Sequence, residues 1–267
     1  MQNYILGNMI GKGSDGEVYE LLEDGYINNK VIKFIQPRIN QGNKYLEPYI
    51  LLHLNHENIM KAEAIEMENN GLLKIIQLRA ELDLLKKISN KHIKAVDKIK
   101  YMREITEGIN FLHQHHILHG DIKPNNILLL NNTVKLTDFS LSRVIDKGCI
   151  INYNSTYTLC YRPPEVKENK LYLKSDIWAL GCTLYEIFYG TKYFVLTKEL
   201  KLYHIANKSS PGLFDGMIAK MIEKNIDERF SIEDILPFFN LVKKKDKYIP
   251  MFQESDNNFH CYDLYVK

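Results

Sequence analysis

Several features that would fix a protein's class are scarce or missing in this sequence. Only four cysteines occur among 267 residues and none forms a Cys-x-x-Cys pair, so neither a disulfide framework nor a cysteine-rich zinc cluster is indicated. No apolar run reaches the roughly 18 residues of a membrane span, and the segment MQNYILGNMIGKGS lacks the basic and apolar regions of a signal peptide. We therefore expect an intracellular protein, cytoplasmic or nuclear, with reduced thiols.

A strong charge of either sign is missing as well. The formal net charge is +2 and the pI is about 8.1, which predicts neither a nucleic-acid partner nor a membrane surface. Lysines gather between Lys86 and Lys100, and we interpret this run as a solvated helix face, with a docking patch as the alternative. The 45% hydrophobic and 25% charged shares are typical of a globular protein with one large core or two small ones.

The spacing of glycines and apolar residues divides the chain into two parts. Up to about residue 35, short runs rich in Val, Ile and Tyr alternate with glycine turns, which predicts antiparallel strands. A helix is expected at PYILLHLNH and another strand at Leu72–Ala80. Ile93, Val96 and the apolar residues up to Leu112 recur every three or four positions, and later helices include the nearly all-apolar Ser175–Phe188. These patterns predict a small β-rich lobe, a connector and a larger helical lobe, with a ligand site in the crevice.

The segment IGKGSDGEVYE carries a glycine pattern in which Gly11, Gly13 and Gly16 match GxGxxG. A P-loop is excluded because only three residues separate Gly7 from Gly11. A Rossmann turn is excluded because the following EVYELL is strand-like rather than helical. Glycines of a turn-rich sheet are one remaining explanation, and a hairpin whose backbone amides approach phosphates is the other.

A lysine stands inside the apolar strand KVIKFI. Alternation places Lys33 on the same face as Val31 and Ile35, where a cation needs an anionic partner. The alternative is an edge-strand lysine whose amine reaches water. We favour the anionic partner, because an apolar face is an unfavourable place for a lone cation.

Two apolar segments carry polar side chains of complementary chemistry. HILHGDIKPNNILL contains Asp121, Lys123 and Asn126, and VKLTDFSLSR supplies Asp138 twelve residues after Asn126. A hairpin-like arrangement of the two runs would hold these groups near one point. Carboxylate and amide oxygens suit Mg²⁺, which prefers one or two carboxylates plus phosphate oxygens, and Asp121 remains as a candidate base. The set predicts phosphoryl transfer.

In order along the chain, the glycine segment, Lys33, HGDIKPNN, TDFS, YRPPE and SDIWALGC resemble the signature set of the eukaryotic protein kinases, and YRPPE most resembles the branch with cyclin-dependent and mitogen-activated kinases. The resemblance covers about residues 4–242. It implies an α+β, bilobal fold with a small antiparallel β-rich N-lobe and a mainly helical C-lobe. The implied bounds are about 1–77 for the N-lobe, 78–82 for the hinge, 83–245 for the C-lobe and 246–267 for a C-terminal tail.

The same resemblance implies ATP and Mg²⁺ as cofactors and a role for each motif. Asp121 would accept the proton of the substrate hydroxyl, with Lys123 beside it as in serine/threonine kinases, and Asn126 and Asp138 would bind Mg²⁺. Further nucleotide contacts would come from Ile10, Gly11, Lys12, Gly13, Ser14, Asp15, Gly16, Glu17, Val18, Lys33, Gln77, Ala80, Asp83 and Leu128.

Other roles carried by the resemblance concern the scaffold. Ile76 would lie at the back of the adenine pocket with Gln77–Ala80 as the hinge, an alignment that could shift by one residue. Buried contacts of the large lobe would also be carried over: Glu165 would pair with Arg229, Asp176 would anchor the catalytic loop, and His119 would pack on Phe139. A metal site built from the histidines between His113 and His119 is the alternative reading of that cluster, without a Cys or carboxylate nearby to complete it.

Three positions depart from the family pattern. Gly120 stands where most relatives carry an arginine that reads a phosphate on the activation loop, so we expect little dependence on phosphorylation of Ser155, Thr156 or Tyr157. Ser140 replaces a glycine, and we expect it at negative φ.

The third departure is at the residue expected to pair with Lys33. That residue is Glu47, and Pro48 follows it directly. Proline favours the first helical position and disfavours helical geometry in the residue before it, which predicts Glu47 at a helix start and a weakened pair.

The sequence thus predicts a serine/threonine kinase with protein substrates. A pseudokinase that binds nucleotide or serves as a scaffold is the main alternative, and a small-molecule kinase is disfavoured by the peptide-groove motif YRPPE. The aromatic C-terminal tail is a candidate docking segment for a regulatory protein.

Overall fold

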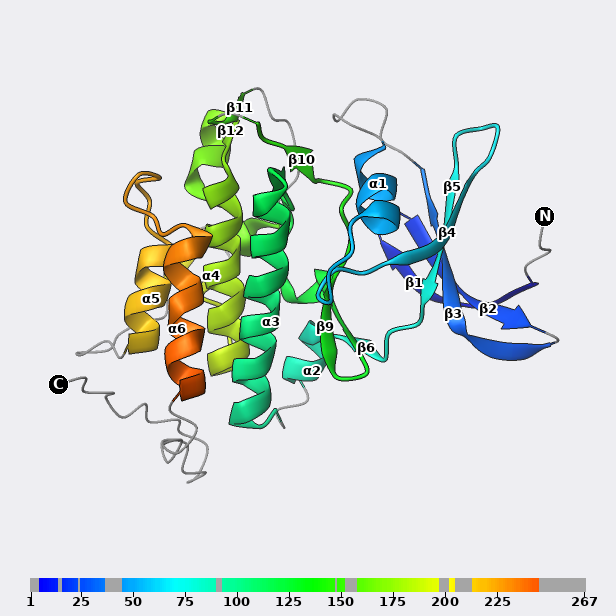
Figure 1. The fold of residues 1–267 in the computed structure, drawn as a ribbon, viewed down its shortest axis with the longest axis horizontal. Coiled ribbons are helices and arrows are strands. Elements are labelled where there is room, and N and C mark those ends of the chain that lie inside the picture. The colour runs from blue at the N-terminus through cyan, green and yellow to red at the C-terminus, as the bar shows by residue number, and fades with distance from the viewer. Residues whose placement is uncertain are drawn as a thin grey trace.

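The computed structural model describes residues 5–13, 16–23, 25–36, 45–89, 93–146, 148–151, 158–196, 202–204 and 213–244. The chain forms two lobes, one built around a sheet and one mainly helical (Figure 1). The predicted α+β, two-lobed architecture is therefore confirmed. None of the helices in these ranges combines the length and the apolar character that a membrane crossing needs.

The small lobe is an antiparallel sheet with one helix beside it. Its strands are β1 (Ile5–Gly13), β2 (Gly16–Glu23), β3 (Tyr26–Ile35), β4 (Ala62–Met67) and β5 (Leu73–Leu78), in the spatial order β1-β2-β3-β5-β4. Helix α1 (Leu46–His53) packs beside β4 and buries Leu46, Ile50 and Leu51 against the core. The strands predicted within the first 35 residues are confirmed, and the strand expected at Leu72–Ala80 is β5.

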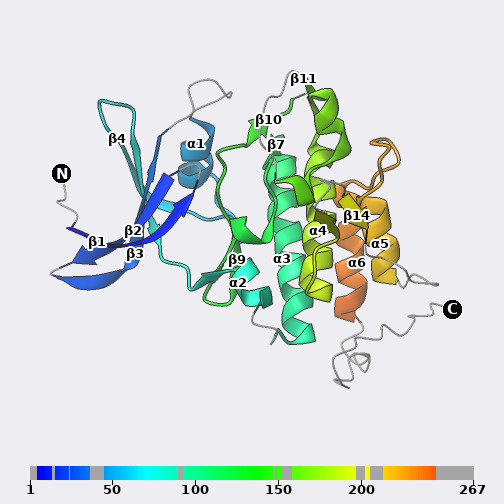
Figure 2. The ribbon, with the colours of Figure 1, turned by 180° about the vertical axis from the view of Figure 1, so that it is seen from behind.

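The large lobe begins where the chain leaves β5. Its first elements are β6 (Leu82–Asp83), α2 (Leu84–Ser89), α3 (Ala95–Gln114), β7 (Ile117–Leu118), β8 (Ile127–Leu130), β9 (Thr133–Leu136) and β10 (Arg143–Val144). Strands β6, β8 and β9 form a small sheet, and Figure 2 shows α2 and β9 at the junction with the small lobe. The junction is thus built from two stretches of the chain, residues 82–89 and 127–136.

The remaining elements complete the helical body. They are β11 (Ile150–Ile151), β12 (Lys170–Leu171), α4 (Leu173–Tyr189), β13 (Phe194–Leu196), β14 (Leu202–His204), α5 (Leu213–Met221) and α6 (Ile232–Lys244), with 3₁₀ turns at Pro124–Asn126, Leu159–Tyr161 and Pro164–Glu168. Helix α4 is buried from Ser175 to Ile187, which confirms the helix predicted to lie in the core.

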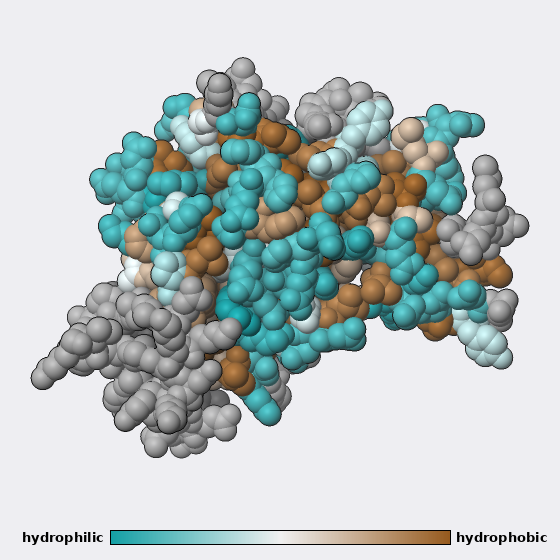
Figure 3. Space-filling view, in the orientation of Figure 1, coloured by the Kyte–Doolittle hydropathy of each residue, from teal (hydrophilic) through white to brown (hydrophobic). Residues whose placement is uncertain are grey.

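Helix α3 runs alongside α4 and α6 with one apolar stripe. Ile105, Ile109 and Leu112 are fully buried, as the spacing predicts. Hydrophilic residues cover most of the outward side of this lobe in the face drawn in Figure 3. Val96 departs from the expectation, since it is 59% exposed in the first turn of α3.

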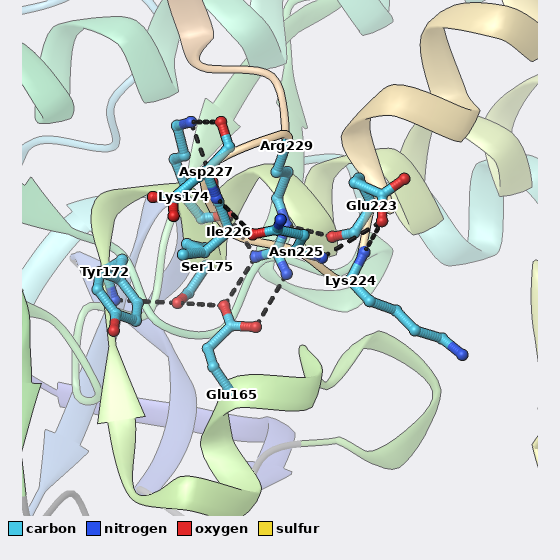
Figure 4. Close-up of polar contacts among 10 residues, drawn as sticks. All are labelled: Glu165, Tyr172, Lys174, Ser175, Glu223, Lys224, Asn225, Ile226, Asp227 and Arg229. Carbon is cyan, nitrogen blue, oxygen red and sulfur yellow. Dashed lines mark hydrogen bonds and ion pairs between the residues drawn. The ribbon is translucent and has the colours of Figure 1, made fainter.

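A buried ion pair ties the chain after β11 to the turn before α6 (Figure 4). Arg229 Nη1 and Nη2 donate to Glu165 Oε1 and Oε2 at 2.7 and 2.9 Å, and Ser175 Oγ donates to Oε1 at 2.7 Å. The remaining guanidinium nitrogen Nε donates to the carbonyl of Glu223, and the guanidinium lies over the ring of Trp178. The predicted Glu165–Arg229 strut is confirmed, with all its polar atoms satisfied.

Replacing Arg229 by Met should destabilise the protein strongly, because it leaves the Glu165 carboxylate buried without a cation. Breaking one partner of a buried pair costs about 3–5 kcal/mol, and we expect that loss in the free energy of unfolding measured with urea. The matched control is Lys170→Met, which removes the exposed Lys170–Glu168 bridge of 3.0 Å. A loss for Arg229→Met no larger than for the control would contradict the role of the strut.

Candidate active site

The loop between β7 and the Pro124–Asn126 turn is fixed by a buried carboxylate from α4. Asp176 is 1% exposed, and its two oxygens accept hydrogen bonds from the backbone amides of His119 and Gly120 at 2.8 and 2.9 Å. His113 Nε2 lies 3.1 Å from Asp176 Oδ2. A helix of the rigid core therefore determines where the following residues point, and the anchoring role predicted for Asp176 is confirmed.

Asp121, Lys123 and Asn126 converge directly after this anchor. Lys123 Nζ donates to Asp121 Oδ2 at 2.6 Å and to Thr158 Oγ1 at 3.1 Å. Asn126 Nδ2 donates to Asp121 Oδ2 at 2.8 Å and to its carbonyl at 2.9 Å. These contacts orient one carboxylate from two sides and direct the Asn126 carbonyl oxygen away from Asp121.

Gly120 adopts a backbone conformation that leaves no room for a side chain. Its φ is +83°, and a Cβ built on it would lie 2.7 Å from the carbonyl oxygen of Leu141. An arginine here would meet the same oxygen in this backbone arrangement. The glycine therefore serves the turn that presents its amide to Asp176.

Lys33 lies between two carboxylates from different elements. Its Nζ is 3.5 Å from Glu47 Oε1 of α1 and 3.5 Å from Asp138 Oδ1, which follows β9. The side chains of Lys33 and Glu47 are 15% and 9% exposed, so the contact is shielded from water. The anionic partner expected for Lys33 is confirmed, and the edge-strand alternative is excluded because β3 is an inner strand.

Glu47 occupies the first turn of α1, as predicted, but Pro48 does not occupy the first helical position. The helix begins at Leu46, so Pro48 is its third residue rather than its first. Proline is tolerated there because the first amides of a helix have no intrahelical partner. The 3.5 Å separation from Lys33 exceeds the roughly 2.7–2.9 Å usual for charge-assisted hydrogen bonds, in agreement with a weakened pair.

Asp138 is held in a strained conformation that points its carboxylate at Lys33. Its φ is +64°, which is unusual for a residue with a side chain and costs of order 1–3 kcal/mol. Burial alone would raise the pKa of Asp138, but the amine of Lys33 and a hydrogen bond from Ser140 help to hold that pKa below its ordinary value. The aspartate is therefore ionised at neutral pH, and its Oδ1 faces the Lys33 amine at 3.5 Å without a hydrogen bond from the described residues.

Ser140 confirms one expectation and His119 another. Ser140 is absent from the described non-glycine residues with positive φ, as predicted.

His119 is fully buried, with its ring 5.0 Å from that of Phe139 and Nε2 3.2 Å from the carbonyl oxygen of Thr137. Burial lowers the pKa of His119, so its ring is neutral and serves as a core residue. Among the described residues, no group of three or more His, Cys, Asp and Glu side chains could hold a metal ion.

A cleft of about 730 Å³ opens between the lobes and collects most of these groups. Among the predicted site residues, it is lined by Ile10, Gly11, Lys12, Gly16, Val18, Lys33, Gln77, Ala80, Asp83, Lys123, Asn126, Leu128 and Asp138. Asp83 caps α2 by accepting the amide of Lys86 at 2.8 Å. The sheet thus provides a ceiling and the loops after β7 and β9 provide a floor.

Several predicted residues do not line the cleft. Asp121 and Glu47 lie next to it instead: Asp121 contacts the lining residues Lys123 and Asn126, and Glu47 contacts Lys33. Glu17 does not line the cleft, because its carboxylate accepts hydrogen bonds from Lys12 Nζ at 2.7 Å and from the Tyr19 hydroxyl. Gly13, the last residue of β1, does not line the cleft either. The other predicted residues lie outside the described part of the chain: Ser14, Asp15, Ser155, Thr156 and Tyr157.

The expectation that Ile76 lies at the back of the adenine pocket was wrong. Ile76 packs with Leu21 and Ile32 on the opposite face of the sheet, and Gln77 lines the cleft instead. Gln77 pairs with Val31 and therefore shares its face, because neighbouring residues in register point the same way. The expected alignment is shifted by one residue, which places Gln77 at the back and Leu78–Ala80 along the edge of the cleft.

Sequence reasoning missed several residues that line the cleft. Among them are Val31, Asn125 and Thr158. Val31 could have been found, since alternation already placed it on the face of Lys33. Thr158 is brought to Lys123 by tertiary folding alone, and no local signal indicates it.

Replacing Gly120 by Ala should lower the free energy of unfolding by more than the same change at Gly25. Both glycines have φ +83°, but a Cβ at Gly25 would meet nothing within 4 Å. The control variant therefore measures the backbone cost alone, of order 1 kcal/mol, and Gly120→Ala adds the contact with Leu141. Equal losses in urea unfolding would show that the loop relaxes around a side chain and would contradict the close approach.

The protein kinase domain family (Pkinase) matches residues 4–239 of this chain. A dual specificity protein kinase Ttk of Danio rerio is 28% identical over 271 residues, covering 90% of this chain and 27% of the relative. A probable cell division protein kinase of Encephalitozoon cuniculi is 29% identical over 262 residues, covering 88% of this chain and 96% of the relative.

The serine/threonine-protein kinase Nek11 of Homo sapiens is 30% identical over 289 residues, covering 97% of this chain and 44% of the relative. The chain thus spans less than half of two of these three relatives and nearly all of the third. The resemblance to the branch of cyclin-dependent and mitogen-activated kinases stays a prediction. The family match over most of the chain, together with the convergence of its motif residues on one cleft, shows that this chain belongs to the protein kinase family.

Proposed function

We propose that this chain is a serine/threonine protein kinase that transfers the γ-phosphate of ATP to hydroxyl groups of protein substrates. The observation that carries the proposal is the convergence of an oriented carboxylate and two cations at one cleft. Asp121 is held by Lys123 and Asn126, and Lys33 stands opposite on the ceiling. Phosphoryl transfer depends mainly on positioning and charge neutralisation, and this arrangement offers both.

Each group has a distinct task in this proposal. The amine of Lys33 binds the α and β phosphates, and the backbone of Gly11 and Gly16 approaches them from above. The Asp121 carboxylate accepts the proton of the substrate hydroxyl as that hydroxyl oxygen attacks the γ-phosphorus, and the bond from the γ-phosphorus to the bridging oxygen breaks so that ADP leaves. Lys123, bonded to both Asp121 and Thr158, provides positive charge where the transferred group passes.

The residues of the floor fit a magnesium ion. Asp138 presents a buried carboxylate oxygen without a hydrogen bond from the described residues, and Asn126 uses its amide nitrogen on Asp121 so that its carbonyl oxygen is left over. Oxygen donors of these two kinds, completed by phosphate oxygens, suit Mg²⁺. When bound, the ion neutralises phosphate charge. We propose Asn126 and Asp138 as its ligands.

The alternatives make different use of the same cleft. A pseudokinase that only binds nucleotide would not need Asp121 oriented from two sides, and every residue of the catalytic set is retained here. A small-molecule kinase would not need the segment YRPPE, whose Glu165 is built into the buried strut. Serine and threonine are the proposed acceptors because Lys123 stands where serine/threonine kinases carry a lysine beside the catalytic aspartate. One relative is named a dual specificity kinase.

Some features of the proposal lie outside the described residues. The C-terminal tail over 246–267 is proposed as the docking segment for a regulatory protein, and the kinase domain is proposed to span 1–245. A cytoplasmic or nuclear location stays a prediction from the sequence, as does independence from phosphorylation of Ser155, Thr156 and Tyr157.

Replacing Asp121 by Asn should abolish most transfer while leaving ATP binding nearly unchanged. A general base contributes about 10²- to 10⁴-fold, and we expect a loss of that size in incorporation of labelled phosphate into generic protein substrates with ATP and Mg²⁺. The control is Asp97→Asn, in the first turn of α3 and outside the cleft lining. Phosphoamino-acid analysis should show phosphoserine and phosphothreonine. Transfer by Asp121→Asn at the rate of the control would refute the proposed mechanism.

Replacing Lys33 by Met should cost more activity than replacing Glu47 by Gln. Lys33 contacts two carboxylates and lines the cleft, whereas Glu47 does not line the cleft and lies 3.5 Å from Lys33. We expect Lys33→Met to lose about 10²-fold or more in kcat/KM, and Glu47→Gln to lose about tenfold or less. Equal losses would mean that Lys33 depends wholly on Glu47 for its position.

A further inference from the structure

A partly buried ion pair joins the glycine-bearing hairpin to the segment between the lobes. Arg79 Nη1 donates to Glu20 Oε1 at 2.8 Å. Glu20 lies on β2 and Arg79 directly follows β5, so the bridge passes over the intervening strand β3. The Glu20 side chain is 8% exposed and that of Arg79 is 38% exposed.

The register of the sheet places this pair on the face that forms the cleft ceiling. Val18 and Glu20 are two residues apart on β2 and share a face, and Val31 is opposite Glu20. Gln77 is opposite Val31, and Arg79 lies two residues beyond Gln77. Val18, Val31, Gln77 and Arg79 all line the cleft. The Glu20–Arg79 bridge therefore lies on the cleft face of the sheet, next to the residues that line the cleft.

Glu20 depends on its partner because it has little contact with water. Its second oxygen, Oε2, is buried and has no hydrogen-bond partner in the described part of the chain. Strand β1 passes close above it, since a Cβ at Gly7 would lie 3.0 Å from Glu20 Cβ and 3.4 Å from Oε2. A buried carboxylate that loses its cation is costly, so without Arg79 the hairpin would be driven to open and hydrate Glu20.

We propose that the Glu20–Arg79 bridge fixes the height of the β1–β2 hairpin above the cleft and thereby sets the affinity for the nucleotide. The inference rests on the proposed function and makes Arg79 a positioning residue, which acts through Glu20 and the hairpin. Opening the hairpin moves Gly11 and Gly16 away from the phosphates. Asp121 and Asn126 belong to the large lobe and do not move with the hairpin. Loss of the bridge therefore weakens nucleotide binding and leaves the rate of the transfer step nearly unchanged.

The test measures ATP affinity by isothermal titration calorimetry in the presence of Mg²⁺ for four forms of the full chain. These are the unaltered protein, Arg79→Met, Glu20→Gln and the double variant. Arg79→Met should raise the Kd for ATP about tenfold, equivalent to about 1.4 kcal/mol. The double variant should recover most of that loss, because the neutral amide introduced by Glu20→Gln needs no cation. In steady-state assays KM for ATP should rise with kcat kept within about twofold.

The control is Glu68→Gln, which removes the 2.7 Å Glu68–Lys74 bridge at the turn between β4 and β5, away from the cleft lining. It should leave the Kd unchanged, and thermal melts of all variants show whether the fold persists. An unchanged Kd in Arg79→Met, or no recovery in the double variant, overturns the inference while the proposed function stands. If the unaltered protein binds no ATP, both fail.

Discussion

The site depends on one cation placed between two carboxylates. The amine of Lys33 lies 3.5 Å from Glu47 of the helix in the small lobe and 3.5 Å from Asp138 on the floor of the cleft. Because Lys33 is on an inner strand and largely shielded from water, its charge needs anionic neighbours, and Glu47 and Asp138 are two of them. The contact therefore couples the sheet, α1 and the loop after β9, and through them the two lobes.

Rigidity is distributed unevenly around this contact. Below the cleft, the core helix α4 holds the catalytic loop through Asp176, and the buried Glu165–Arg229 strut fastens the chain beside it. Above the cleft, the hairpin of β1 and β2 is held by more exposed polar contacts, such as Lys12–Glu17 and Glu20–Arg79. A fixed floor with an adjustable ceiling suits a site that must bind a nucleotide and release it.

Much of this site could be predicted from the sequence because the chemistry resides in short local motifs. The two apolar runs were sufficient to predict Asp121, Asn126 and Asp138 near one point, and the resemblance to the kinases added Lys33 to them. Ile76 was misplaced because β5 is apolar on both faces, so its own pattern does not reveal which side meets the cleft; pairing with Val31 decides it. The place of Thr158 and the Glu20–Arg79 bridge likewise depend on contacts between distant segments, which no single segment encodes.

We infer that Asp138, whose Oδ1 faces Lys33 and accepts no hydrogen bond from the described residues, joins a divalent ion to the nucleotide in this cleft. The most direct measurement is ATP affinity with and without Mg²⁺, for the unaltered protein and for Asp138→Asn. We expect Mg²⁺ to tighten ATP binding to the unaltered protein and this gain to disappear in Asp138→Asn. The same gain in both proteins would contradict this inference.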